Sequence, residues 1–182
     1  MILDYRRSLN MKKTLFIVST KSGGTAETLP YMKYFYNETL AEVGKKEVGK
    51  HFVAITDPGS NLEKIAEDLK FRTTFLNDPN IGGRYSALSF VGIPPAVFQG
   101  VDVPLLLGRA IKMLHNNESC NCAVEGDHSG AWLGAIMGEL TKAGHDKVTL
   151  ITSPPIQGFG AWAEQLIAES TGKSGKGILP VD

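Results

Sequence analysis

The sequence predicts an α/β protein in which helices cover a mainly parallel sheet in a three-layer α/β/α arrangement. Short apolar runs alternate with segments whose apolar residues recur at helical spacing, as in strands joined by helices. Several of these runs are apolar on both faces, which is typical of strands covered on both sides. Hydrophobic residues make up 42% of the 182 residues and charged residues 21%, so the composition excludes wholesale disorder.

Four apolar runs are the predicted strands. They are residues 14–19, 51–56, 72–76 and 147–152. The front part of the chain therefore has three clear strands, and the back part has one or two. Because sheets usually contain more strands than this, we expect both sheets to be incomplete.

Helices are predicted between these strands from apolar spacing and capping residues. Residues 29–43 follow helical spacing, and Pro30 fits only if it lies in the first turn. Residues 60–63, Ser-Asn-Leu-Glu, form a capping box that opens the next helix. Asp102 and Ser129 are the predicted N-caps of two later helices.

Boundaries within the chain are predicted at a proline and at a weakly patterned segment. Pro95 should break or kink any helix that begins near Ser86. Residues 116–128 show the weakest pattern and are the best candidate for a linker. The expected domains are residues 1–116 and residues 117–182.

Charge and hydropathy exclude several classes of protein. The chain has 19 basic and 19 acidic residues, so its net charge gives no reason to bind nucleic acid or an anionic membrane. The most apolar neighbourhood, residues 90–111, is interrupted by prolines and charged residues and predicts no membrane span. Residues 15–19 are too short a run for a signal peptide. We expect a soluble cytoplasmic protein.

A metal site is considered at a group of four potential ligands and rejected. They are His115, Cys120, Cys122 and His128. The spacing C-x-C differs from the usual C-x₂₋₄-C of zinc sites, and the intervening residues are polar and typical of a loop. We expect loop cysteines, solvated histidines and no metal.

The first candidate site is the segment after the first predicted strand, residues 19–28, S-T-K-S-G-G-T-A-E-T. A strand leading through glycines to a helix N-terminus favours anion binding, because free N–H groups point at the ligand. The hydroxyl groups of the segment are those of Thr20, Ser22, Thr25 and Thr28. The segment matches neither the Walker pattern nor G-x-G-x-x-G. The alternative is an ordinary turn rich in capping residues.

The second and third candidate sites contain charged side chains. In residues 80–86, N-I-G-G-R-Y-S, two glycines let the chain bend before Arg84, which can stabilise an oxyanion. The alternative there is a turn with a surface arginine. Gln165 and Glu169 share one helix face, and a carboxylate beside the bending Gly172 can act as a general base. The alternative for Glu169 is a solvated helix face.

These three segments, in this order, resemble the glucose-6-phosphate isomerase family. Residues 20–28 look like the family loop S-K-(S/T)-x-x-T-x-E-T, with Thr20 in place of serine. Residues 80–92, N-I-G-G-R-Y-S-A-L-S-F-V-G, are similar to a specific family signature, and residues 165–173 look like Q-x-x-x-E-S-x-G-K. The resemblance runs from about Lys12 to the end of the chain.

The resemblance implies a Rossmann-like fold of the sugar-isomerase (SIS) type and a role for each candidate residue. Arg84 stabilises a cis-enediol(ate), Gly83 beside it binds substrate, Glu169 moves the proton between C2 and C1, and Gln165 positions the substrate. The implied phosphate ligands are Ser22, Thr25 and Thr28, together with Thr20 and the backbone of Lys21. No metal or organic cofactor is implied.

The implied reaction is the interconversion of glucose 6-phosphate and fructose 6-phosphate in glycolysis and gluconeogenesis. Residues 52–59 and 151–162 most resemble the isomerase part of bacterial bifunctional transaldolase/glucose-6-phosphate isomerases. The implied partners are thus a phosphosugar, a second subunit in a homodimer and a fused transaldolase part. The chain looks like an internal piece of the isomerase, in which residues 1–116 are part of a first SIS-type subdomain and residues 117–182 are the start of a second. Two alternatives stay open, a non-catalytic SIS-type phosphosugar-binding module and an isomerase of amino sugars.

Overall fold

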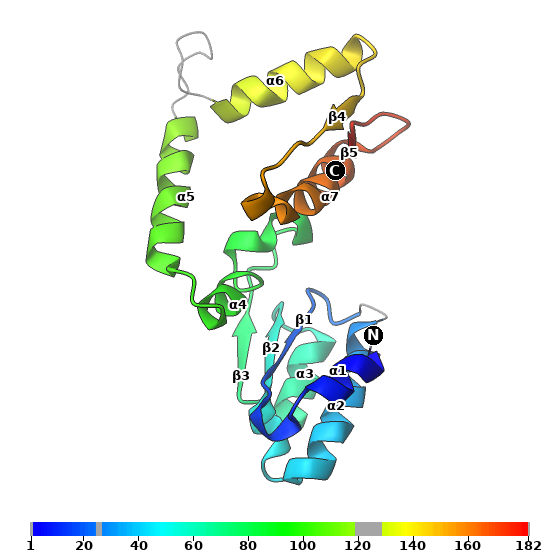
Figure 1. Ribbon diagram of the computed structural model, residues 1–182, viewed down its shortest axis with the longest axis vertical. Coiled ribbons are helices and arrows are strands. Elements are labelled where there is room, and N and C mark those ends of the chain that lie inside the picture. The colour runs from blue at the N-terminus through cyan, green and yellow to red at the C-terminus, as the bar shows by residue number, and fades with distance from the viewer. Residues whose placement is uncertain (1, 25–26, 119–128, 182) are drawn as a thin grey trace. The chain divides into compact units, whose positions relative to one another are not determined.

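The computed structural model describes residues 2–24, 27–118 and 129–181 (Figure 1). The chain forms two compact units, residues 1–101 (unit 1) and residues 102–182 (unit 2), and each is described by itself. No helix within the described ranges is both long enough and apolar enough to cross a membrane.

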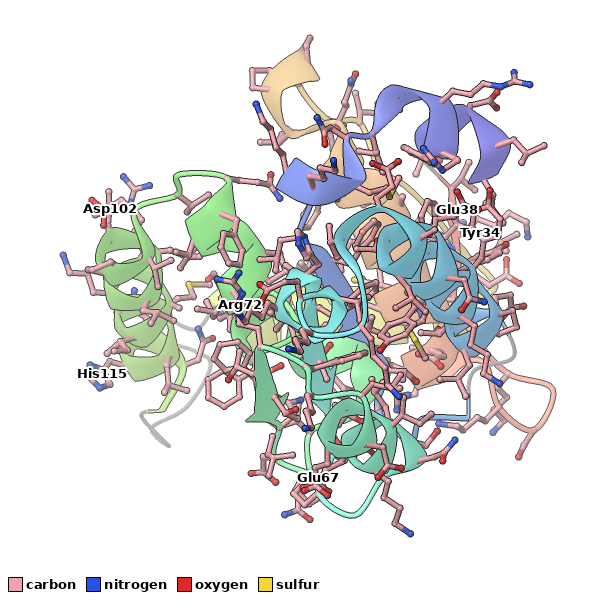
Figure 2. The ribbon with its side chains drawn as sticks, turned by 90° about the horizontal axis from the view of Figure 1, so that it is seen from below. Tyr34, Glu38, Glu67, Arg72, Asp102 and His115 are labelled. Atoms are coloured by element: carbon pink, nitrogen blue, oxygen red, sulfur yellow. The ribbon has the colours of Figure 1, made fainter. Side chains whose placement is uncertain are left out.

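Unit 1 is built from strands that alternate with helices. Its elements, with η marking a 3₁₀-helix, are α1 (Ile2–Ser8), η1 (Met11–Lys13), β1 (Phe16–Ser19), α2 (Thr28–Val43), η2 (Val48–His51), β2 (Phe52–Thr56), α3 (Asn61–Asp68), β3 (Thr73–Leu76), η3 (Gly83–Leu88) and α4 (Ile93–Phe98). Helix α1 is tied to α2, because Arg6 forms ion pairs with Glu38 and Glu42. Glu38 is labelled on α2 in Figure 2.

The sheet of unit 1 has three parallel strands in the order β1-β2-β3. All five residues of the central strand β2 are buried. Phe52 and Ala54, on one face of β2, belong to the same core cluster as Met32 of α2 and Leu62 of α3. Because alternate strand residues share a face, α2 and α3 both cover this face. The α/β class with parallel strands is confirmed.

Unit 2 has a small parallel sheet and few buried side chains. Its elements are α5 (Val103–Glu118), α6 (Ser129–Lys142), β4 (Lys147–Thr149), η4 (Pro154–Ile156), α7 (Gly158–Thr171) and β5 (Leu179–Val181). Strands β4 and β5 pair in parallel. Helix α6 buries none of its residues, and α7 buries only Gly160 and Ala163. This two-stranded sheet and the three-stranded sheet of unit 1 agree with the expected strand numbers.

Helix boundaries follow the local signals closely. Ser60 caps α3 by accepting a hydrogen bond from the N–H of Glu63 at 3.1 Å, and Pro30 lies in the first turn of α2. Asp102 Oδ1 accepts a hydrogen bond from the N–H of Leu105 at 2.9 Å, as expected of an N-cap. Helix α6 begins at Ser129.

Pro95 starts a helix instead of breaking one. Residues 83–88 form the 3₁₀-helix η3, and α4 begins afresh at Ile93 with prolines in its first turn. A proline is tolerated there because its missing N–H would have no partner within the helix.

All four strand predictions are too long at one end, by one residue at His51 and at Arg72 and by more in the other two strands. Strand β1 begins at Phe16, because Thr14 terminates η1 and its hydroxyl bonds the carbonyl of Asn10. Strand β4 ends at Thr149, and Ile151, predicted to lie in the strand, is 94% exposed. Apolar runs therefore predict strands that are longer than the segments that pair with a neighbouring strand.

The two compact units divide before α5, whereas the domains predicted from sequence divide at residue 116. The two divisions differ in the placement of helix α5. The predicted boundary followed the weak pattern of residues 116–128 and so assigned most of α5 to the front part, whereas α5 belongs to unit 2. Within unit 2, α5 contacts α6. The assignment of two SIS-type subdomains stays a prediction.

Candidate active site

The hydroxyl-rich segment leaves the carboxyl end of β1 as predicted. Thr20 is buried, and its N–H donates to the carbonyl of Ile55 in β2 at 3.1 Å. Ser22 is exposed, and its hydroxyl accepts a hydrogen bond from the N–H of Gly24 at 3.3 Å. Thr28, the first residue of α2, lines a groove of about 310 Å³ together with Ser19 of β1. Thr25 lies outside the described residues.

Gly23 brings this segment against the first turn of α3. Its φ of +73° lies in the left-handed region that side chains rarely adopt. A Cβ atom at Gly23 would lie 2.8 Å from the backbone nitrogen of Leu62 and 3.1 Å from that of Asn61. Neither backbone atom can move away as a flexible side chain could. A glycine is therefore required at this position.

Gly23→Ala is expected to displace the segment from α3 and to lower the free energy of unfolding by more than the roughly 1–3 kcal/mol that a strained left-handed residue costs by itself. Gly100→Ala is the matched control, since Gly100 also has a positive φ of 78° but has open space where its Cβ would lie. Urea denaturation measures the stability of both variants. Amide exchange at residues 20–24 should accelerate in the Gly23 variant only, and equal exchange in the two variants would contradict a required close approach.

Lys21 ties the segments that follow all three strands. Its ammonium Nζ lies 2.5 Å from Oδ2 of Asp57, which follows β2, and 2.7 Å from the carbonyl oxygen of Pro79, which follows β3. The N–H of Asp57 donates in turn to the carbonyl of Lys21 at 3.1 Å. The carboxyl ends of β1, β2 and β3 are thereby held at one edge of the sheet.

Arg84 lies in η3, on the segment that follows β3. Gly82 precedes η3 in an extended conformation, and the hydroxyl of Ser86 donates to the carbonyl of Gly83 at 2.6 Å. The guanidinium carbon of Arg84 lies 5.1 Å from the ring centroid of Tyr85, within the range of a cation–π contact. A Cβ on Gly83 would meet nothing within 4 Å, so this backbone is open to a ligand.

Gln165 and Glu169 lie one turn apart on α7 of unit 2, and both are exposed. At the end of α7, the hydroxyl of Thr171 donates to the carbonyl of Ile167 at 2.8 Å and accepts a hydrogen bond from the N–H of Ile178 at 2.9 Å. Thr171 thus fixes the end of α7 to the chain that enters β5. The shared helix face predicted for the two site residues is confirmed.

The structure brings the site residues into two sets. The first lies at the carboxyl edge of unit 1 and consists of Thr20, Lys21, Ser22, Thr28, Gly83 and Arg84. The second is Gln165 with Glu169 on α7 of unit 2. The first set carries hydroxyls and a guanidinium, and the second carries a carboxylate and an amide.

Sequence reasoning missed two polar residues at the same edge of unit 1. Asp57 follows β2 directly, and Asn77 follows β3 directly and is buried. The side-chain oxygen of Asn77 accepts a hydrogen bond from the N–H of Phe90 at 3.2 Å, which ties the end of η3 to the sheet. The available signal was their position, since the first residues after parallel strands gather at one edge.

The predicted absence of a metal site concerns residues that are only partly described. His115 lies on α5, whereas Cys120, Cys122 and His128 lie outside the described residues. Among the residues described, no three His, Cys, Asp or Glu side chains are grouped so that they could hold a metal ion.

Parallel strands joined by helices, with hydroxyls, glycines and an arginine in the segments after the strands, define an α/β protein. The sequence model of the family described as phosphoglucose isomerase matches residues 2–176. The chain belongs to the phosphoglucose isomerase family.

Relatives of known name support this membership. The chain is 35% identical over 181 residues to a probable glucose-6-phosphate isomerase from Methanococcus maripaludis, covering 98% of this chain and 39% of that protein. It is 34% identical over 166 residues to a glucose-6-phosphate isomerase from Rubrobacter xylanophilus, covering 90% of this chain and 37% of that protein. The chain therefore spans about two fifths of the length of these relatives.

A solved structure supports the fold. The crystal structure of a hypothetical protein from Thermus thermophilus matches 99% of this chain and 43% of its own chain, with 30% sequence identity and a TM-score of 0.88.

Proposed function

We propose that this protein supplies the phosphate-binding and proton-transfer residues of a glucose-6-phosphate isomerase. The reaction interconverts glucose 6-phosphate and fructose 6-phosphate through a cis-enediol(ate). The observation that carries the proposal is the tie between the hydroxyl-rich segment and the segment leading to Arg84, made by Lys21 at one edge of the sheet. Relatives named as glucose-6-phosphate isomerases support the choice of substrate.

In the proposed site the phosphate is held by hydroxyls and backbone N–H groups. Ser22 and Thr28 provide hydroxyls at the start and end of the segment, Thr20 adds a third from the sheet edge, and Thr25 adds a fourth. The backbone of Lys21 and the helix that begins at Thr28 add N–H donors. Neutral donors suit a phosphate dianion that must be released after each turnover. Each hydrogen bond adds to the binding free energy, but the sum stays smaller than it would be with charged donors.

Proton transfer in the proposed mechanism needs a base and an electrophile. Glu169 takes the proton from C2 of glucose 6-phosphate, or from C1 of fructose 6-phosphate, and returns it to the other carbon. Arg84 stabilises the charge that develops on oxygen in the enediol(ate), while Gly83 leaves its backbone open to the substrate. Gln165, one turn before Glu169 on α7, positions the sugar beside the base.

A non-catalytic SIS-type module that binds a phosphosugar is the second candidate function. It is favoured by the position of the phosphate segment within one compact unit. Such a module binds fructose 6-phosphate without converting it. Homodimer formation and a fused transaldolase part stay predictions of the sequence.

Calorimetric titration with fructose 6-phosphate at low salt tests the proposed site. Binding is expected between micromolar and millimolar, about −8 to −4 kcal/mol. Ser22→Ala should weaken it about tenfold or more, because a hydrogen bond to a charged group contributes about 1.5–3 kcal/mol.

Ser8→Ala is the control for this titration, since the hydroxyl of Ser8 bonds the carbonyl of Tyr5 on an exposed face of α1. It should bind as the unaltered chain does. Equal affinity of the Ser22 and Ser8 variants would contradict the assignment of the phosphate site. No heat from a folded chain would contradict a working site in it.

A further inference from the structure

We propose that Lys21 and Asp57 are a positioning pair, in which the Lys21 ammonium holds the phosphate-binding segment in place instead of serving as the cation that binds the phosphate. The inference rests on the proposed function for the identity of the ligand. It assigns a role to the Lys21 side chain, where the resemblance used only its backbone, and to Asp57, which no motif indicated.

The side-chain contacts of Lys21 point inward, to protein groups. Nζ lies 2.5 Å from Oδ2 of Asp57 and 2.7 Å from the carbonyl oxygen of Pro79. These partners lie 36 and 58 positions along the chain from Lys21 and follow different strands. Two of the three ammonium protons are thus directed at groups that hold neighbouring segments together.

The backbone of Lys21 is fixed by the same neighbours. Its carbonyl oxygen accepts hydrogen bonds from the N–H of Asp57 at 3.1 Å and from the hydroxyl of Thr56 at 3.2 Å. The Thr56 hydroxyl lies 2.7 Å from that of Ser60, the N-cap of α3. The side chain and the backbone carbonyl of Lys21 are therefore both bonded to the end of β2 and to the residue after it. This fixes where the next residues, Ser22 and Gly23, begin.

Burial distinguishes the two members of the pair. The Asp57 side chain is 14% exposed and that of Lys21 is 40% exposed, so the carboxylate is the more enclosed member. Removing the lysine leaves a largely buried carboxylate without its cation, which is costly. Removing the aspartate instead leaves an ammonium that can turn toward solvent or toward a bound anion.

Two roles for Lys21 predict opposite results for Asp57→Ala. If the ammonium were the charge partner of the phosphate, loss of the competing carboxylate would leave the affinity for fructose 6-phosphate unchanged or increase it. In the positioning role, loss of Asp57 loosens the segment and weakens binding. Lys21→Met weakens binding in both cases, so the sign of the Asp57 effect decides between them.

The experiment is a double-mutant cycle on the full chain, with fructose 6-phosphate as the probe. We expect Asp57→Ala and Lys21→Met each to weaken binding about tenfold, and the double variant to be no weaker than either alone, because the pair acts as one unit. Glu47→Ala is the matched control, since it removes the carboxylate of the exposed Glu47–Lys50 pair, and it should bind normally. Unchanged or tighter binding by Asp57→Ala overturns the proposal.

Amide hydrogen exchange separates failure of this inference from failure of the proposed function, because it needs no ligand. The N–H groups of Thr20 and Asp57 bond across β1 and β2, and their exchange should accelerate about tenfold or more in both variants and stay unchanged in Glu47→Ala. Unchanged exchange in a folded Lys21→Met chain overturns the positioning role. If the unaltered chain binds no fructose 6-phosphate, the proposed site fails, and exchange alone decides the role of the pair.

Discussion

Replacing Glu169 by Gln is expected to abolish turnover in the active isomerase while leaving fructose 6-phosphate binding nearly unchanged. Glutamine keeps the size and hydrogen-bonding capacity of the side chain but cannot accept the proton. General acid–base catalysis contributes about 10²–10⁴-fold to a rate, so kcat should fall by at least that factor. The coupled assay that follows glucose 6-phosphate formation measures kcat, and calorimetry measures binding.

Glu164→Gln is the matched control for this prediction. Glu164 is also an exposed glutamate of α7, five positions before Glu169, so the two side chains lie on different faces. It should leave kcat within about twofold, as surface changes away from a site usually do. Retained turnover in the Glu169 variant, or an equal loss in both variants, would exclude Glu169 as the base.

Replacing Arg84 is expected to have the second largest effect. Removal of one group that stabilises a developing oxyanion costs about 10²–10³-fold in kcat, and Arg84→Ala should lose this much with a smaller change in KM. Arg84→Lys keeps the charge but not the planar fork, so it should recover only part of the lost rate. Steady-state kinetics on both variants gives the division between kcat and KM.

The control is Arg109→Ala, which removes an exposed arginine of α5. Its kinetics should match those of the unaltered enzyme. An increase in KM for Arg84→Ala with unchanged kcat would contradict a role in the transition state and would indicate that Arg84 only binds the substrate.

Local signals predicted much of the fold. Ser60, Asp102 and Pro30 act within one helical turn, so their neighbours in sequence are also their neighbours in space. The buried strand β2 was equally clear, because a strand covered on both faces has to be apolar at nearly every position. These features depend on few residues.

Features that depend on pairing between distant segments were not predicted. Strand β5 is a three-residue strand that contains Pro180, a residue that cannot donate a ladder hydrogen bond, and it exists because it pairs with β4. Ile151 has the character of a strand residue but is exposed, since the β4 ladder ends at Thr149. Helix α1 has no strong apolar periodicity and is held by Arg6 against α2.

The candidate site divides in the same way. Each of its segments is continuous in sequence and follows a strand or lies on a helix, so its residue types could be identified from the sequence. The contacts of Lys21 with Asp57 and Pro79 could not, because nothing in the residues near Lys21 indicates which segments will follow the neighbouring strands. These contacts follow from the strand order β1-β2-β3, which places the segments after the three strands next to one another.

Proton exchange with solvent tests the proposed isomerase chemistry most directly. Fructose 6-phosphate is incubated with the protein in deuterium oxide, and NMR follows both glucose 6-phosphate formation and deuterium at C1 and C2. We expect conversion with deuterium incorporation, and neither of them with the Glu169→Gln variant, because a carboxylate base exchanges its proton with water while the enediol(ate) exists. A folded protein that binds fructose 6-phosphate but shows neither conversion nor exchange above the Glu169→Gln level would contradict the isomerase and leave a phosphosugar-binding module.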